Sequence, residues 1–137
     1  MTAARPVGFL DTSVVVRYLT GDPPEMADRA AALIDAGAEL VLSELVLVET
    51  AYVLESFYEI EREPLTEALG DLVRRRNLKL LGLPKNIVLE ALALCRGSRR
   101  VSFADALLWA QAVHADTPRV YSFDRRFPGE GIELPKV

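Results

Sequence analysis

Short apolar runs alternate with longer helical stretches along the whole chain, and this alternation constrains the fold more than any other feature. The apolar runs expected to form strands are residues 7–10, 39–42, 78–81 and 119–123, with residues 132–134 as a fifth strand at an edge. The helical patterns between them cover residues 12–20, 22–36, 43–58, 64–77, 84–97 and 102–115. Strands that alternate with helices form parallel sheets with helices on both faces. We therefore expect an α/β fold with a central, mostly parallel sheet of four or five strands.

Length and composition favour one domain without covalent cross-links. The chain has 137 residues, 50% of them hydrophobic, so a single domain over residues 1–137 is expected. Cys95 is the only cysteine, which excludes an internal disulfide and a cysteine-rich zinc site. The sequence has no signal peptide and no apolar stretch near the ~20 residues that cross a bilayer. These features predict a cytoplasmic protein that does not associate with membranes.

The charge of the chain is acidic overall, but its arginines are clustered. A net charge of −4 and a pI of about 5.1 argue against a general nucleic-acid binder. Arginines nevertheless occur together at residues 74–76, 99–100 and 125–126. Clustered arginine side chains bind phosphate through paired hydrogen bonds. The net charge alone therefore does not exclude a local contact with nucleic acid.

Four carboxylates occur in apolar stretches, where a charge is costly unless it is paired or bound to a metal. Asp11 and Asp124 each follow a predicted strand, whereas Glu49 and Asp105 lie within predicted helices. Ligands bind at the carboxyl ends of parallel strands, so Asp11 and Asp124 should reach the same edge of the sheet. Oxygen-only donors favour Mg²⁺ or Mn²⁺, and a single histidine, His114, does not suit zinc hydrolase sites. We expect one metal site formed by all four carboxylates.

Each carboxylate also has a purely structural explanation. Asp11 is a favoured residue for capping the N-terminus of a helix, and Asp124 suits an Asx turn. Ser102 and Asp105 match a capping box. Glu49 is harder to explain in this way, because its helical neighbours three and four positions away are apolar. The case for a metal site therefore depends on the set of four and not on any one of them.

Four segments of the chain resemble, in order, the motifs of the PIN-domain nuclease family. They are Phe-Leu-Asp-Thr-Ser at residues 9–13, Leu-Val-Glu at 47–49, Ser-Phe-Ala-Asp-Ala at 102–106 and Tyr-Ser-Phe-Asp-Arg-Arg-Phe at 121–127. Each motif is weak alone, but the ordered set with this spacing is specific and covers nearly the whole chain. The short length and the segment at 102–106 look most like the VapC-type toxins of toxin–antitoxin pairs.

The resemblance implies a three-layer α/β/α PIN-like domain and an endoribonuclease that depends on Mg²⁺ or Mn²⁺. Transferred by position, the acidic site comprises Asp11, Glu49, Asp105 and Asp124. The first three are expected to be the main metal ligands, while Asp124 would hold a second ion or orient the attacking water. The resemblance also implies an RNA substrate, a homodimer and inhibition by a small VapB-like antitoxin.

Further residues have supporting roles in this hypothesis. The hydroxyls of Thr12 and Ser122 match positions beside the acidic site and are expected to support a ligand or contact the phosphate. Ser122 replaces the threonine often found there, which leaves the chemistry intact. Arg125 and Arg126 are the first candidates for RNA contacts. Arg99 and Arg100 are the second.

Several other functions remain to be weighed against a toxin nuclease. A PIN nuclease that processes ribosomal RNA would carry the same motifs, and a non-catalytic PIN-like module that binds RNA or protein would keep the fold without a competent metal site. A phosphatase of the haloacid-dehalogenase type needs a second acid where this chain has Ser13. A receiver domain fits poorly as well, and no glycine-rich phosphate-binding loop is present.

Overall fold

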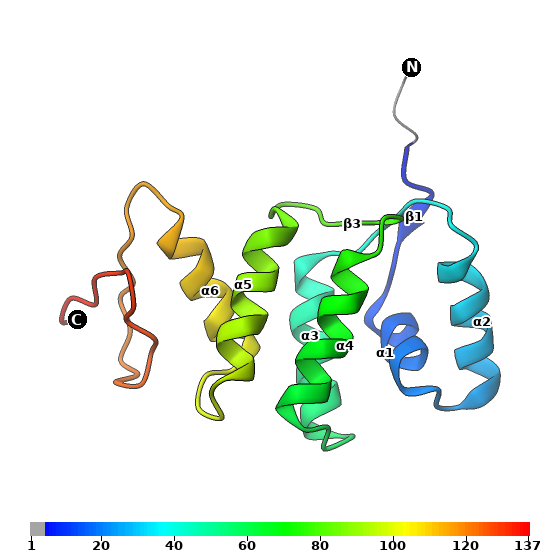
Figure 1. Cartoon of the computed structure of the whole chain (residues 1–137), viewed down its shortest axis with the longest axis horizontal. Helices are drawn as coiled ribbons and strands as arrows, with labels where there is room; N and C mark the ends of the chain where they lie inside the picture. Colours follow the sequence, from blue (N-terminus) through cyan, green and yellow to red (C-terminus); the bar gives the residue numbers. More distant parts are fainter. Residues whose placement is uncertain (1–4) are drawn as a thin grey trace. The chain divides into compact units, whose positions relative to one another are not determined.

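The computed structural model describes residues 5–137, and the chain divides into two compact units, Met1–Leu83 and Pro84–Val137. These are called the N-terminal unit and the C-terminal unit below. In Figure 1 the N-terminal unit runs from blue to green and the C-terminal unit continues to red. Among residues 5–137 there are six α-helices and a parallel sheet, so the α/β class expected from the sequence is confirmed.

A parallel sheet of three strands belongs to the N-terminal unit. Its strands, in spatial order, are β1 (Gly8–Phe9), β2 (Leu40–Val41) and β3 (Leu78–Lys79). Gly8 pairs with Leu40, and Leu40 pairs with Leu78 on its other side. Backbone hydrogen bonds extend the pairing past the strand ends, for example from Leu42 N to the Lys79 carbonyl at 2.8 Å. The first three predicted strands are therefore confirmed, in shorter form.

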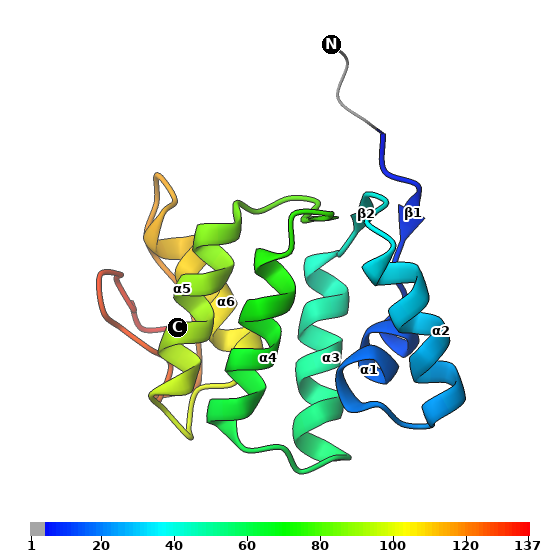
Figure 2. The same cartoon turned by 45° about the vertical axis from the view of Figure 1, so that its right-hand side comes forward.

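The helices of the N-terminal unit form the connections between its strands. They are α1 (Thr12–Thr20), α2 (Pro24–Asp35), α3 (Glu44–Ser56) and α4 (Arg62–Arg74). Helix α1 packs against both α2 and α3, and α3 packs against α4 (Figures 1 and 2). Val15, Ile34, Leu47 and Leu69, one from each helix, are fully buried in this packing. These helices therefore supply most of the apolar core of the unit.

The register between β1 and β2 sets where two helices begin. Phe9 pairs with Val41. Two residues beyond each partner, Asp11 caps the N-terminus of α1 and Ser43 caps that of α3. Because both caps have the same offset from a paired strand residue, the two helices start at matching positions along the sheet.

Local sequence signals place most helix ends correctly, with one clear exception. Gly21 ends α1 in the left-handed region, at φ +71°, which glycine adopts without a Cβ penalty. Helix α4, however, begins at Arg62, earlier than the prediction at Pro64. Proline lacks an N–H donor, but the first helical turn needs none, so Pro64 fits inside that turn.

Polar contacts tie the helices of the N-terminal unit to its strand connections. The Tyr18 hydroxyl donates to Asp35 Oδ1 at 2.8 Å, and the Arg75 guanidinium contacts both side chains, at 3.2 Å and 3.0 Å. This group of three side chains links α1, α2 and the segment after α4. Glu44, in the first turn of α3, accepts hydrogen bonds from the amides of Gly82 and Leu83 at 2.9 and 2.8 Å.

The C-terminal unit contains a helical pair followed by an irregular segment. Helices α5 (Lys85–Arg96) and α6 (Phe103–Val113) pack against each other, and Ser102 caps α6 as predicted. His114, at the C-terminal end of α6, has its Nε2 atom 2.7 Å from Oε2 of Glu90, in the middle of α5. The indole N–H of Trp109, within α6, donates to the carbonyl of Glu130 at 2.8 Å, which holds the irregular segment after α6 to this helix.

The fourth and fifth predicted strands do not form a sheet. Among residues 5–137 the assigned strands number three, and residues 119–123 and 132–134 contribute one isolated parallel bridge between Arg119 and Glu133. Backbone bonds from Val120 N to Glu133 O and from Glu133 N to Pro118 O support that bridge. Pro118 has no N–H to donate, so the ladder cannot extend through it. The sheet is therefore smaller than the four or five strands that the sequence predicts.

No helix in residues 5–137 combines the length and apolar character that crossing a membrane requires.

Candidate active site

Asp11 lies at the junction between β1 and α1, as the sequence predicts. Its Oδ2 atom accepts two hydrogen bonds from Ser13, one from the backbone N–H at 3.1 Å and one from the hydroxyl at 2.6 Å. The hydroxyl bond, followed by the amide bond, lowers the pKa of Asp11 below its ordinary value of 3.8. The carboxylate is exposed and remains ionised at neutral pH. It therefore caps a helix and is still available to a cation.

The hydroxyl that supports Asp11 belongs to Ser13, which the sequence analysis did not single out. Thr12, which was expected to support the site, is 8% exposed, and its supporting role stays a prediction. A signal for Ser13 was nevertheless present. The side chain of a cap residue accepts a hydrogen bond from the amide two positions later. A serine at that position can also donate its hydroxyl to the same carboxylate oxygen.

Glu49 lies in the middle of α3, the helix that packs against α1. Its helical neighbours Leu45 and Tyr52 are apolar, as the sequence indicates, but they are 74% and 65% exposed. The buried side of α3 is formed instead by residues such as Leu47 and Leu54. Glu49 is therefore an exposed carboxylate within an exposed apolar stripe, and the expectation of a buried setting is wrong.

Asp105 occupies the first turn of α6 in the C-terminal unit. The Ser102 hydroxyl accepts a hydrogen bond from the Asp105 amide at 3.1 Å, which confirms one half of the predicted capping box. Within residues 5–137 no return bond links the Ser102 amide to the Asp105 carboxylate. The half-buried Asp105 side chain thus keeps its oxygen atoms available for another partner.

Asp124 lies in a turn of the C-terminal unit that two local hydrogen bonds stabilise. Ser122 Oγ accepts from the Asp124 amide at 3.0 Å, and Asp124 Oδ1 accepts from the Arg126 amide at 2.9 Å. The Asx turn considered for Asp124 is therefore present, and Ser122 contacts the backbone of the residue it was expected to support. The carboxylate itself is exposed, so the turn does not prevent it from binding an ion.

The four predicted acids are divided equally between the two units. Asp11 and Glu49 belong to the N-terminal unit, on neighbouring helices, while Asp105 and Asp124 belong to the C-terminal unit. Counting residues 5–137, no three Asp, Glu, His or Cys side chains within either unit form a group that could hold a metal ion. Asp11, Glu49, Asp105 and Asp124 form no ion pair with any residue in the range 5–137. A site built from all four needs both units and stays a prediction.

The arginines predicted to contact RNA are exposed. Arg125 and Arg126 directly follow Asp124, and Arg99 and Arg100 lie in the connection between α5 and α6. Within residues 5–137 none of the four forms an ion pair. Their positive charges are therefore available to an external anion.

The sequence also matches a known protein family. The model of the PIN domain family matches residues 8–129, a range that contains all four acids and reaches across both units. The chain belongs to the PIN-domain family, and its mixed α/β structure with a parallel sheet is consistent with the three-layer fold expected from the resemblance.

A comparison with curated proteins gives a more particular relationship. The chain is 30% identical over 130 residues to a protein named VapC ribonuclease from Aquifex aeolicus (strain VF5). The aligned region covers 91% of this chain and 93% of that protein. No solved structure matches the chain. The similarity to a VapC-type protein therefore extends over nearly the full length of both sequences.

Proposed function

We propose that this protein is a divalent-metal-dependent endoribonuclease that hydrolyses phosphodiester bonds in RNA and acts as the toxin of a toxin–antitoxin pair. One observation carries the proposal. Asp11 is oriented by Ser13 at the start of a PIN-domain match, and the same match contains Glu49, Asp105 and Asp124, which form no ion pair within residues 5–137. Near full-length similarity to a protein named VapC ribonuclease supports the same activity.

The donor atoms fit a hard divalent cation. Carboxylate oxygens without competing ion pairs are the ligands that Mg²⁺ and Mn²⁺ prefer. In the proposed site Asp11, Glu49 and Asp105 would hold the ion, and Asp124 would hold a second ion or orient the attacking water. When bound, such an ion lowers the pKa of a coordinated water and offsets charge on the phosphate.

The residues of the chain itself supply the remaining functions. The Ser13 hydroxyl lowers the pKa of Asp11 and orients its carboxylate through the 2.6 Å hydrogen bond. The backbone bond from Arg126 to Asp124 orients that carboxylate in the same way. Guanidinium groups of Arg125 and Arg126, and in second place Arg99 and Arg100, would bind RNA phosphates through charge-assisted hydrogen bonds.

Cleavage of a structured RNA by the purified protein tests the proposal. The wild type with Mn²⁺ should cleave, addition of EDTA should abolish cleavage, and the change Asp11→Asn should reduce it by on the order of 100-fold or more. Asp71→Asn is a matched control, because Asp71 is an exposed acid of the same unit whose ion pair with Arg74 spans 3.7 Å at the surface. Equal cleavage by the wild type with Mn²⁺, the wild type with EDTA and Asp11→Asn would refute the proposal.

Two alternatives give different results in further measurements. A non-catalytic PIN-like module would show no saturable heat when titrated with Mn²⁺ in a calorimeter. A PIN nuclease that processes ribosomal RNA would cleave RNA but would not arrest growth when expressed. Growth arrest that is relieved by a small neighbouring gene would identify the toxin and its VapB-like antitoxin.

The assembly and location of the protein are parts of the same proposal. We expect one PIN domain over residues 1–137 and a homodimer, which light scattering on the purified protein would detect. We also expect the protein to be cytoplasmic, because its proposed RNA substrate is found in the cytoplasm.

A further inference from the structure

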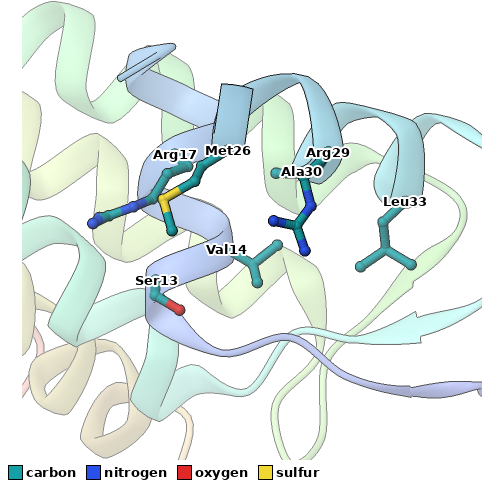
Figure 3. A pocket seen from close by; sticks show the side chains of 7 residues that line it. All are labelled: Ser13, Val14, Arg17, Met26, Arg29, Ala30 and Leu33. Atoms are coloured by element: carbon teal, nitrogen blue, oxygen red, sulfur yellow. The ribbon is translucent and has the colours of Figure 1, made fainter. Parts of the chain in front are cut away.

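A cavity of about 330 Å³ lies between α1 and α2 in the N-terminal unit. Helix α1 contributes Ser13, Val14 and Arg17 to its lining, and α2 contributes Met26, Arg29, Ala30 and Leu33. In Figure 3 the side chains of Arg17 and Met26 lie beside each other, and the Arg29 guanidinium lies between Val14 and Leu33. The cavity therefore presents apolar surface together with two positive charges.

The two arginines of this cavity differ from three other arginines of the same unit. Arg62, Arg74 and Arg75 pair with Glu55, Asp71 and Asp35. Arg17 and Arg29 form no ion pair with any of residues 5–137. Arg17 lies in the last turn of α1, where the helix dipole favours a positive charge, and this partly explains why an arginine occurs there. It does not account for Arg29, which lies inside α2 and faces the same cavity.

The cavity is linked to the predicted catalytic acid through one residue. Ser13 lines the cavity, and its hydroxyl donates to Asp11 Oδ2 at 2.6 Å. A molecule in the cavity that touches Ser13 would therefore be separated from the Asp11 carboxylate only by the Ser13 side chain. An RNA bound at Asp11 can extend into this cavity.

We propose that this cavity binds one nucleotide of the RNA substrate, next to the phosphate that is cleaved. Arg17 and Arg29, whose guanidinium groups point to different sides in Figure 3, each bind a backbone phosphate, since guanidinium groups match phosphate geometry. The apolar side chains of Met26 and Leu33, which are 49% and 43% exposed, contact the base. This inference rests on the proposed ribonuclease function and adds a specificity-determining subsite to it.

The size and charge of the cavity favour this occupant over a peptide helix. Its volume lies near the lower limit of the roughly 300–1,000 Å³ typical of ligand pockets, which suits a single compact group. Unpaired bases of single-stranded RNA are bound by apolar and guanidinium surfaces of this kind. Two guanidiniums without ion-pair partners also complement the negative charge of a phosphodiester.

Binding of a fluorescein-labelled single-stranded RNA, measured by anisotropy in EDTA, tests the proposal directly. The double variant Arg17→Gln/Arg29→Gln should bind roughly tenfold more weakly, as expected when charge-assisted hydrogen bonds are removed. The slope of log affinity against log salt should fall by about 0.7 for each RNA phosphate that the variant no longer binds. Arg74→Gln is the control, because Arg74 is an exposed arginine of the same unit outside the cavity, and its affinity and slope should match those of the wild type.

A second variant examines the apolar part of the cavity. Met26→Glu places a negative charge beside Arg17 at a position that is half exposed, so the fold should tolerate it. It should raise KM for RNA cleavage with Mn²⁺ by about tenfold and leave kcat nearly unchanged, as expected when substrate binding alone is weakened. A loss of kcat at unchanged KM would contradict a binding role.

The outcomes separate failure of the subsite from failure of the proposed function. If the wild type neither binds nor cleaves RNA, the proposed function is wrong and the subsite fails with it. If the wild type cleaves RNA and the cavity variants retain its KM and salt slope, only the subsite is wrong. Loss of binding to a labelled polyglutamate peptide in the same variants, with RNA binding retained, would overturn the RNA assignment in favour of an acidic protein segment.

Discussion

The two units of this chain contrast in how their backbone is held. In the N-terminal unit, pairing among three strands and four packed helices fixes the segments that carry Asp11 and Glu49. In the C-terminal unit, the segment after α6 that carries Asp124 has no regular strand or helix. It is held by the bridge and the 2.8 Å ion pair between Arg119 and Glu133, by the bond from Trp109 to Glu130, and by burial of Val120 and Phe127. Predicted catalytic groups therefore lie both on a regular framework and on a segment without regular secondary structure. Cooperation between the two is the central requirement of the proposed site.

The largest expected effect tests whether the two units contribute to one site. Asp11→Asn and Asp105→Asn should each reduce RNA cleavage by on the order of 100-fold or more. The double variant should lose little beyond the single changes, because groups that act as one unit are strongly non-additive. Single-turnover cleavage rates of the four proteins measure this coupling.

Controls for that comparison use acids outside the predicted site. Asp71 in the N-terminal unit and Asp116 in the C-terminal unit are both exposed. The changes Asp71→Asn and Asp116→Asn should leave the cleavage rate unchanged. Effects of Asp11→Asn and Asp105→Asn that multiply, to on the order of 10⁴-fold, would mean that the two residues act independently.

A smaller effect is expected from removing the anchor of the C-terminal segment. Trp109→Phe removes the indole donor to the Glu130 carbonyl, at a cost of roughly 0.5–1.5 kcal/mol, because water can reach the exposed Glu130. Hydrogen exchange should accelerate in residues 114–137 and remain unchanged in β1, β2 and α3, because regions with few restraints open locally. Equal acceleration in both units would show that they open together, and the contrast drawn above would be wrong.

The smallest effect concerns the polar contacts of the N-terminal unit. Tyr18→Phe removes the bond to Asp35 and should cost less than about 1 kcal/mol, because the group is partly solvated. Burial, followed by that hydrogen bond, raises the pKa of Tyr18 above 10.0. The contribution of the hydroxyl is therefore complete below pH 10 and is lost as the pH rises through the higher pKa of the folded state.

Urea midpoints of the wild type and Tyr18→Phe, measured from pH 7 to pH 11, give the size and sign of this effect. The difference between the two proteins should be constant up to about pH 10 and should then shrink. A difference that grows with pH would mean that the folded protein favours the ionised phenol.

Local signals in the sequence predict much of the N-terminal unit. Gly21 and Ser43 mark helix ends in this unit through local preferences that do not depend on distant residues. Ser102, whose cap role is confirmed, does the same in the C-terminal unit. Residues 119–123 have the composition of a strand, but a strand needs a partner, and pairing over long range is not encoded in local composition. The structure gives that segment a single bridge, with Pro118 at its border.

The candidate site was predicted unevenly for the same reason. The cap role of Asp11 follows from its neighbours, and so does the turn at Asp124. The apolar neighbours of Glu49 suggest a buried position for it. This inference fails because two of them, Leu45 and Tyr52, are themselves exposed. Ser13 does not stand out in the sequence, because hydroxyl side chains near helix caps are common and its contact with Asp11 depends on the orientation of one side chain.

The matched offset of Asp11 and Ser43 from the paired residues Phe9 and Val41 has a consequence for which length changes the chain can absorb. One residue deleted between Val41 and Ser43 would displace α3, and Glu49 with it, by about 3.3 Å relative to Asp11. A residue added near Glu59, in the connection after α3, leaves that spacing untouched. Tolerance to insertion and deletion should therefore be lowest at these two strand-to-helix junctions and highest at the far ends of the same helices.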